Sequence, residues 1–223
     1  MMPKYVNYAS MGAIIGHELT HGFDDKGSQF GKIGSLENWW QPTVEEKFRS
    51  KTQCIQKQYS NFVEPLTRKS VNGIITLGEN IADNGGVKQA LKAYKNFIKK
   101  RKEPERRLPG LNLTNEQTFF ASYAMKLVDA TIFTKKLDCQ CFYRVVTTLH
   151  HCELENGAER HETHLFWCSN TKPATLLLQI LTDPHSPGIF RSNGPLSNIQ
   201  DFASAYNCPV GSPMNPQDKC AVW

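Results

Sequence analysis

The sequence predicts a mainly α-helical protein, and three stretches carry that prediction. Residues 8–23 are small and apolar as far as two histidines, which suits a buried helix. Residues 43–62 place Thr43 as an N-cap with a glutamate three residues later, and apolar side chains then recur on one helical face. Residues 79–102 also place apolar side chains at helical spacing. A chain of 223 residues forms one domain or two small ones.

The other expected elements are shorter. Thr114 predicts the N-cap of a further helix, with Gln117 three residues later, and Phe119 and Phe120 follow on it. Residues 71–77 form a short β-favouring run. We also expect loops at residues 24–34, near 104–110 and at 183–195, helices at 175–182 and 196–206, and a proline-rich tail at 208–223.

Composition limits the function classes. Hydrophobic residues make up 39% of the chain and charged residues 21%, which is ordinary for a globular protein. Much of the net charge of +5 comes from a basic run between residues 99 and 107, interpreted as a solvated helix end and loop. No aromatic residues are interleaved with these charges to stack on bases, so we predict no nucleic-acid partner.

Cysteine usage indicates an extracellular protein. The chain has seven cysteines, and Asn112 begins an N-glycosylation acceptor pattern, both of which are typical of extracellular proteins. The first residues show no signal-peptide pattern, and no stretch approaches the roughly 18 apolar residues of a membrane span. We therefore expect the N-terminal part of the protein to lie upstream of Met1.

The motif that indicates chemistry is H-E-x-x-H at residues 17–21. Positions four apart share a helix face, so His17 and His21 can bind one metal ion. Glu18 can then take a proton from a metal-bound water.

The third ligand decides the kind of metal site. The metzincin arrangement needs a histidine six residues after the second one, and Gly27 stands there instead. Glu79, at the start of a later helix, would complete a His2Glu site with one position left for water or substrate. Asp83 shares that helix face and can accept a hydrogen bond from the ring N–H of His17. The alternative is that Glu79 only complements the helix dipole.

With these motifs the chain resembles the catalytic C-terminal part of the neprilysin and endothelin-converting enzyme family, the M13 zinc metallopeptidases. The resemblance covers about residues 3–125 and 167–223. It rests on GHELTHGFDD (16–25), NWW (38–40), Cys54 with QYS (58–60), GENIADNGG (78–86), FFASYA (119–124), DPHSPG (183–188) with Phe190 and Arg191, MNP (214–216) and KCAVW (219–223). It implies a thermolysin-like zincin (gluzincin) catalytic domain, truncated at its N-terminus.

The resemblance implies a zinc endopeptidase. His17, His21 and Glu79 match the ligands of one Zn²⁺ per chain, and Glu18 matches the general base. Family members cleave oligopeptides on the N-terminal side of hydrophobic residues, so peptides are the expected substrates.

The resemblance also assigns four further residues. Asp83 and Asp24 match carboxylates that support the metal ligands. His185 matches the histidine that stabilises the oxyanion of the tetrahedral intermediate. Arg191 matches the arginine that binds a substrate carbonyl.

The chain departs from the family in length. The family's N-terminal part supplies a helical lid and, in some members, a membrane anchor, and we expect both to lie outside this chain. It also supplies the partners of the cysteines that match Cys168 and Cys208. The disulfide that the resemblance implies between Cys54 and Cys220 can still form. The alternative function is therefore a non-catalytic zinc-binding fragment that lacks its lid.

The second departure is an insert at residues 126–166, between two parts of the M13-like domain at 1–125 and 167–223. The favoured interpretation is a disordered segment or a gene-model or splicing artefact, such as a retained intron. The alternative is a small metal module built from Cys139, Cys141, Cys152, His161 and His164.

Overall fold

The protein was analysed as a computed structural model, which describes residues 2–101, 105–127 and 173–223. Its elements are α1 (Lys4–Asn7), a π-helical segment (Tyr8–Gly12), α2 (Ala13–His21), a 3₁₀ turn (Gly27–Gln29), α3 (Pro42–Ser60), α4 (Leu77–Lys99), α5 (Asn115–Leu127), α7 (Pro173–Thr182), α8 (Gly188–Ser197) and α9 (Gln200–Ala205). Among the described residues, extended pairing is confined to isolated bridges. The prediction of a mainly helical protein is confirmed. The proposed metal module of residues 139–164 and Cys168 lie outside the described residues.

The three predicted long helices begin earlier than expected, at Lys4, Pro42 and Leu77, the first as a continuous run of α1, the π-helical segment and α2. Helix α3 begins at Pro42, with Gln41 rather than Thr43 at the N-cap, because proline lacks the N–H that the first helical position leaves unpaired. The run of residues 71–77 is a turn and not a strand. The Asn72 Oδ1 accepts the backbone N–H groups of Ile74 and Ile75, and this turn leads directly into α4.

The predicted capping of α5 is confirmed. The Gln117 N–H donates to the Thr114 Oγ1 at 3.1 Å, and the Thr114 N–H donates to the Gln117 Oε1 at 2.8 Å. This reciprocal pair satisfies two donors that the start of a helix would otherwise leave free.

The predicted loop at residues 183–195 is wrong, because α8 occupies its second half. Pro195 lies in the last turn of this helix and has no N–H to donate to the Arg191 carbonyl. The hydroxyl of Tyr123, on α5, donates to that carbonyl at 3.1 Å instead. A tertiary contact thus compensates for the proline.

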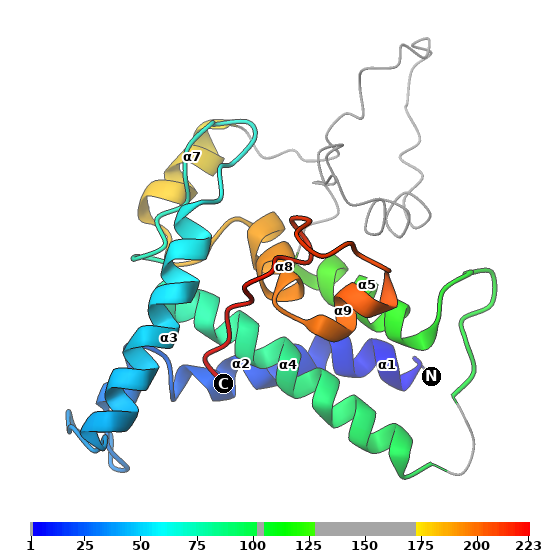
Figure 1. The fold of residues 1–223 in the computed structure, drawn as a ribbon, viewed down its shortest axis with the longest axis horizontal. Helices are drawn as coiled ribbons and strands as arrows, with labels where there is room; N and C mark the ends of the chain where they lie inside the picture. The colour runs from blue at the N-terminus through cyan, green and yellow to red at the C-terminus, as the bar shows by residue number, and fades with distance from the viewer. Residues whose placement is uncertain (1, 102–104, 128–172) are drawn as a thin grey trace.

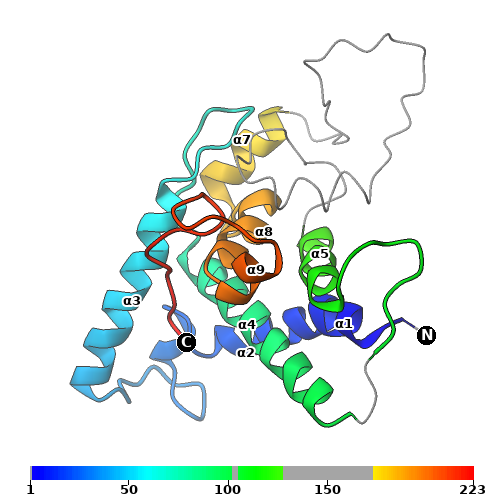
Figure 2. The same cartoon turned by 45° about the vertical axis from the view of Figure 1, so that its right-hand side comes forward.

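Helices α2 and α4 form the most extensive helix pair of the fold and cross with almost no space between their backbones. A Cβ atom added at Gly86 would lie 2.6 Å from the Ala13 carbonyl oxygen, and one at Gly16 would lie 2.8 Å from that of Gly86. In Figure 1, α1 and α2 lie in line across α4. Figure 2 shows α8 and α9 between α3 and α5, above α4.

Two apolar clusters hold this arrangement. One joins α1, α4, α5 and α9, and its fully buried members include Tyr5, Phe120 and Phe202. The other joins α3, α4 and α8 to the C-terminal tail around Ile55 and Ile81. Each fully buried side chain of this size contributes about 1.5–3 kcal/mol.

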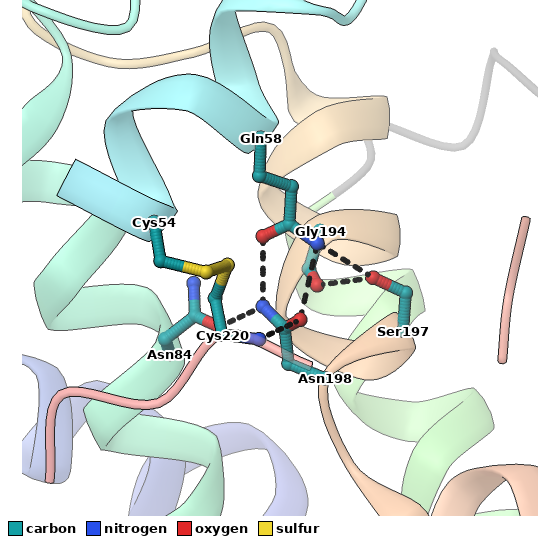
Figure 3. The surroundings of a disulfide bond; sticks show 7 residues. All are labelled: Cys54, Gln58, Asn84, Gly194, Ser197, Asn198 and Cys220. Atoms are coloured by element: carbon teal, nitrogen blue, oxygen red, sulfur yellow. Dashed lines mark hydrogen bonds between the residues drawn. A yellow bond between two sulfur atoms is a disulfide. The ribbon is translucent and has the colours of Figure 1, made fainter. Parts of the chain in front are cut away.

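The C-terminal tail is fixed by a disulfide and a buried amide cluster (Figure 3). Cys54 of α3 is bonded to Cys220 with a Cα–Cα distance of 5.6 Å, as the family resemblance implied. The Cys220 N–H donates to the Asn198 Oδ1 at 3.0 Å. The Asn198 Nδ2 in turn donates to Gln58 on α3 and to Asn84 on α4. One amide therefore ties the tail to the two long helices.

The α2–α4 crossing yields a stability prediction. Gly86→Ala should lower the free energy of unfolding by about 1–3 kcal/mol, because its methyl group meets backbone and not a movable side chain. Gly12→Ala is the matched control, since its Cβ would lie 3.7 Å from the nearest atom and alanine favours a helix by about 1 kcal/mol. Urea unfolding of both variants measures the difference. Equal stability of the two would contradict the close crossing.

Candidate metal centre

Three side chains from two helices converge on one point. His17 and His21 lie four residues apart on α2, and their Nε2 atoms are 3.0 Å from one another. Glu79, in the first turn of α4, brings its Oε2 to 3.2 Å from the His17 Nε2 and its Oε1 to 3.5 Å from the His21 Nε2. All three offer ligand atoms within 4.8 Å of one another, so the group can hold a metal ion. The alternative, a Glu79 that only complements the helix dipole, does not account for this convergence.

A second set of carboxylates orients the two imidazoles. The Asp83 Oδ1 lies 2.9 Å from the His17 Nδ1, and the Asp24 Oδ2 lies 2.7 Å from the His21 Nδ1. Asp24 is itself fixed, because its Oδ1 accepts the N–H groups of Lys26 and Gly27. The Nδ1 of His21 thus has a hydrogen bond to its carboxylate, whereas the Nδ1 of His17 lies at ion-pair distance from Asp83 without a well-aligned hydrogen bond among the described residues. A proton on Nδ1 leaves the Nε2 lone pair for a metal.

The donor set fits a divalent cation. With Nδ1 of each ring next to a carboxylate, the two Nε2 atoms, 3.0 Å apart, are placed to share one positive charge between them. The Glu79 Oε2 is buried and has no hydrogen bond of good geometry among the described residues. Two imidazoles, one carboxylate and a remaining open position are the ligands of a catalytic zinc site.

The pKa values also indicate a site that favours positive charge. Burial lowers the pKa of His17, but the side chains of Asp83 and Glu79 outweigh burial and raise it to about 9. Burial raises the pKa of Glu79, yet the nearby His17 and His185 imidazoles lower it overall. A bound proton supplies the positive charge here when no metal does, so a metal ion and a proton compete for the same place.

His185 and Arg191, far away in sequence, also reach this group. The His185 Nε2 lies 3.0 Å from the Glu79 Oε2. Arg191 donates from Nε and Nη2 to the two oxygens of Asp83 at 2.8 and 2.9 Å, a bidentate pair. Burial lowers the pKa of Arg191, but Asp83 and then Glu79 raise it overall. The arginine thereby fixes the carboxylate that orients His17.

Asp183 is a site residue that the sequence analysis missed. Its Oδ1 accepts the backbone N–H of His185 at 2.8 Å and lies 2.8 Å from the ring Nδ1 of the same residue. The sequence contained a signal for this contact, because an aspartate side chain commonly accepts the backbone N–H of the residue two positions later and so forms an Asx turn.

The metal-binding group faces an uncovered side of the fold. Glu18 is exposed on α2, and the His21 and His185 side chains are 29% and 41% exposed. A hollow of about 630 Å³ between the loop after α2 and the start of α3 is lined by Asp25 and Trp40 among others, but by none of the three ligands.

Comparison with known proteins identifies the family. The sequence model described as Peptidase family M13 matches residues 1–145 and 161–222. The chain belongs to peptidase family M13. It is 45% identical to neprilysin-11 of Caenorhabditis elegans over 99% of this chain and 21% of that protein. It is 40% identical to human endothelin-converting enzyme 1, over 99% of this chain and 23% of that protein.

Solved structures share the M13 fold. The chain superimposes on a Haemonchus galactose-containing glycoprotein complex with a TM-score of 0.73 at 33% identity, covering 99% of this chain and 30% of that one. It also superimposes on the zinc metalloprotease Zmp1 of Mycobacterium tuberculosis in complex with an inhibitor, with a TM-score of 0.71 at 26% identity, covering 99% and 28%. This M13 chain thus spans about a fifth to a quarter of its curated relatives.

The outer carboxylates yield a metal-affinity prediction. Asp24→Asn should weaken zinc binding about 10- to 100-fold, because an amide cannot orient the His21 ring in the same way. Asp25→Asn removes an equal charge at the next position and is the matched control. Competition with a fluorescent zinc chelator measures both affinities. If Asp24→Asn bound zinc as tightly as the control, Asp24 would not orient His21.

Proposed function

We propose that this M13 chain carries the catalytic site of a zinc-dependent endopeptidase that hydrolyses oligopeptides. The observation that carries the proposal is the convergence of His17, His21 and Glu79, with each imidazole oriented by its own carboxylate. Family membership and the similarity to a zinc metalloprotease support zinc as the metal.

Different side chains of this protein have different roles in the proposed reaction. Zinc, when bound, acts as a Lewis acid and makes a water molecule easier to deprotonate. Glu18, exposed on α2 next to His17, would act as the general base toward the attacking water and then return the proton to the leaving amine. His185, whose Nε2 faces the ligand group, donates a hydrogen bond to the developing oxyanion.

Arg191 has two tasks in this proposal. Its Nε and Nη2 hold Asp83, and the guanidinium retains further N–H donors that can reach a substrate carbonyl. Its side chain is 20% exposed, so it is accessible from the site. Cleavage on the N-terminal side of hydrophobic residues is the specificity that we propose from the family resemblance.

We propose that the N-terminal part of the same polypeptide covers the open side as a lid. The π-helical segment, α2 and the turn after it expose a stripe of apolar side chains at four-residue spacing, each more than half exposed: Met11, Ile15, Leu19 and Phe23. Helical spacing places this stripe on the face of α2 away from His17 and His21, so it offers the rest of the polypeptide a second contact surface. Such a continuous apolar stripe favours burial against another surface. The relatives are four to five times longer than this chain and have enough polypeptide to provide one.

We also propose that the full-length protein is extracellular. The Cys54–Cys220 disulfide requires an oxidising compartment, and Asn112 is exposed as a glycosylation site must be. Within the residues that the structure describes, no helix is both long and apolar enough to cross a membrane.

The domain organisation is also a proposal. We propose an M13-like domain at residues 1–125 and 167–223, with an insert at residues 126–166.

A second candidate is a non-catalytic zinc-binding fragment. The exposure of Glu18, His21 and His185 favours it, because an uncovered site holds neither substrate nor a water-excluded environment. The two candidates predict the same metal content and differ in turnover.

Substitution of the proposed base tests the function. Glu18→Gln should lower kcat about 10²- to 10⁴-fold on a quenched-fluorescence peptide with a hydrophobic residue after the scissile bond. Bound zinc should stay at one per chain, because Glu18 is not a ligand. Glu46→Gln, at an exposed position of α3, is the matched control and should leave kcat unchanged. Equal hydrolysis by wild type and Glu18→Gln would contradict a catalytic Glu18.

A further inference from the structure

Two buried polar residues stand next in sequence to two residues of the candidate site. Asn80 follows Glu79, and Ser186 follows His185. Both are fully buried, with 0% of their surface exposed. The Ser186 Oγ donates a hydrogen bond to the Asn80 Oδ1 at 2.8 Å. This bond joins the loop before α8 to α4 one residue away from the 3.0 Å contact between His185 and Glu79.

The direction of this hydrogen bond is fixed by its neighbours. The Asn80 Nδ2 donates to the Thr76 Oγ1 at 2.8 Å, and the Thr76 hydroxyl donates to the Asn72 carbonyl at 2.9 Å. Asn80 therefore presents its oxygen, and not its nitrogen, to Ser186. Because both groups are buried, removal of the serine hydroxyl leaves an acceptor without a donor, which is costly in a protein interior.

The local contacts of His185 do not fix its position relative to α4. Asp183 holds the backbone N–H and the ring Nδ1 of His185, so it sets the ring within its own loop. The distance between that loop and Glu79 depends on contacts that join the loop to α4. The hydrogen bond from Ser186 to Asn80 is such a contact.

We propose that Asn80 and Ser186 are positioning residues that place His185 for its role in peptide hydrolysis. The inference rests on the proposed function, in which His185 donates to the oxyanion. A donor must lie within hydrogen-bond distance of the place where that charge develops. A displacement of about 1 Å can lower a rate by about 10²-fold, so a buried hydrogen bond that holds the loop of the donor against α4 bears on catalysis.

Ser186→Ala in the zinc-loaded protein tests the positioning role. It should lower kcat about 10- to 100-fold and leave KM within about threefold, because the transition state and not the bound substrate needs His185 in place. The matched control is Ser192→Ala, at a buried serine of α8 whose Oγ has no hydrogen bond among the described residues. Ser186→Cys keeps the side-chain volume with a weaker donor and replaces Ser186→Ala if the latter does not fold.

A double-mutant cycle with His185→Ala distinguishes positioning from a general structural role. Ser186→Ala should have no further effect on kcat in a His185→Ala background, because there is no donor left to misplace. If Ser186→Ala lowers kcat by the same factor in both backgrounds, or if Ser192→Ala lowers it equally in the wild type, the proposal is wrong.

Hydrogen exchange gives a readout that does not need catalysis. The His185 N–H, which donates to Asp183, should exchange about fivefold faster in Ser186→Ala than in Ser192→Ala. A wild-type protein that binds zinc without hydrolysing peptides, but shows this difference, would refute the proposed function and leave the positioning of His185 intact. Unchanged exchange at His185 in the Ser186→Ala variant would refute the positioning role itself.

Discussion

The close crossing of α2 and α4 is the constraint on which the rest of the site depends. Gly16 and Gly86 let the two backbones touch, and a side chain at either position would meet main-chain atoms. The crossing lies next to the ligands, because Gly16 precedes His17 and the Gly86 backbone lies against the His17 backbone. Glu79, at the start of α4, can therefore reach both imidazoles of α2.

Asp83 extends this pair of helices to a third element. Its two oxygens face the His17 Nδ1 and the Arg191 guanidinium, so one buried carboxylate connects α2, α4 and α8. The position of α8 is in turn secured by Asn198 and the disulfide-linked tail. Contacts that stabilise the fold, and that lie far from the metal ligands in the sequence, therefore also maintain the geometry of the site.

Local sequence patterns predicted the parts of the site that depend on helical periodicity alone. The spacing of His17 and His21 places both on one face, and Glu79 and Asp83 repeat that spacing on α4. The approach of α4 to α2 was expected from chemistry and family resemblance, not from periodicity. Without that resemblance His185 in its proline- and glycine-rich loop would have been read as a surface residue.

The errors have two physical causes, a tertiary contact that outweighs local preference and a local side-chain contact that the β-favouring composition hid. Helix α8 persists around Pro195 because Tyr123, from another helix, takes the carbonyl that the proline leaves free. The β-favouring run before α4 forms a turn for a local reason, because the Asn72 side chain accepts the backbone N–H groups two and three residues later. The bond between Ser186 and Asn80 joins distant parts of the chain, so a single sequence gives no signal for it.

Zinc K-edge X-ray absorption of the purified protein tests most directly whether the two crossing helices hold a catalytic metal site. We expect one zinc per chain, with nitrogen and oxygen ligands at about 2.0–2.2 Å and two imidazoles among them. Sulfur ligands at about 2.3 Å would place the metal on cysteines instead. Such ligands, or a protein purified without zinc that also fails to bind added zinc, would contradict a metal centre formed by His17, His21 and Glu79.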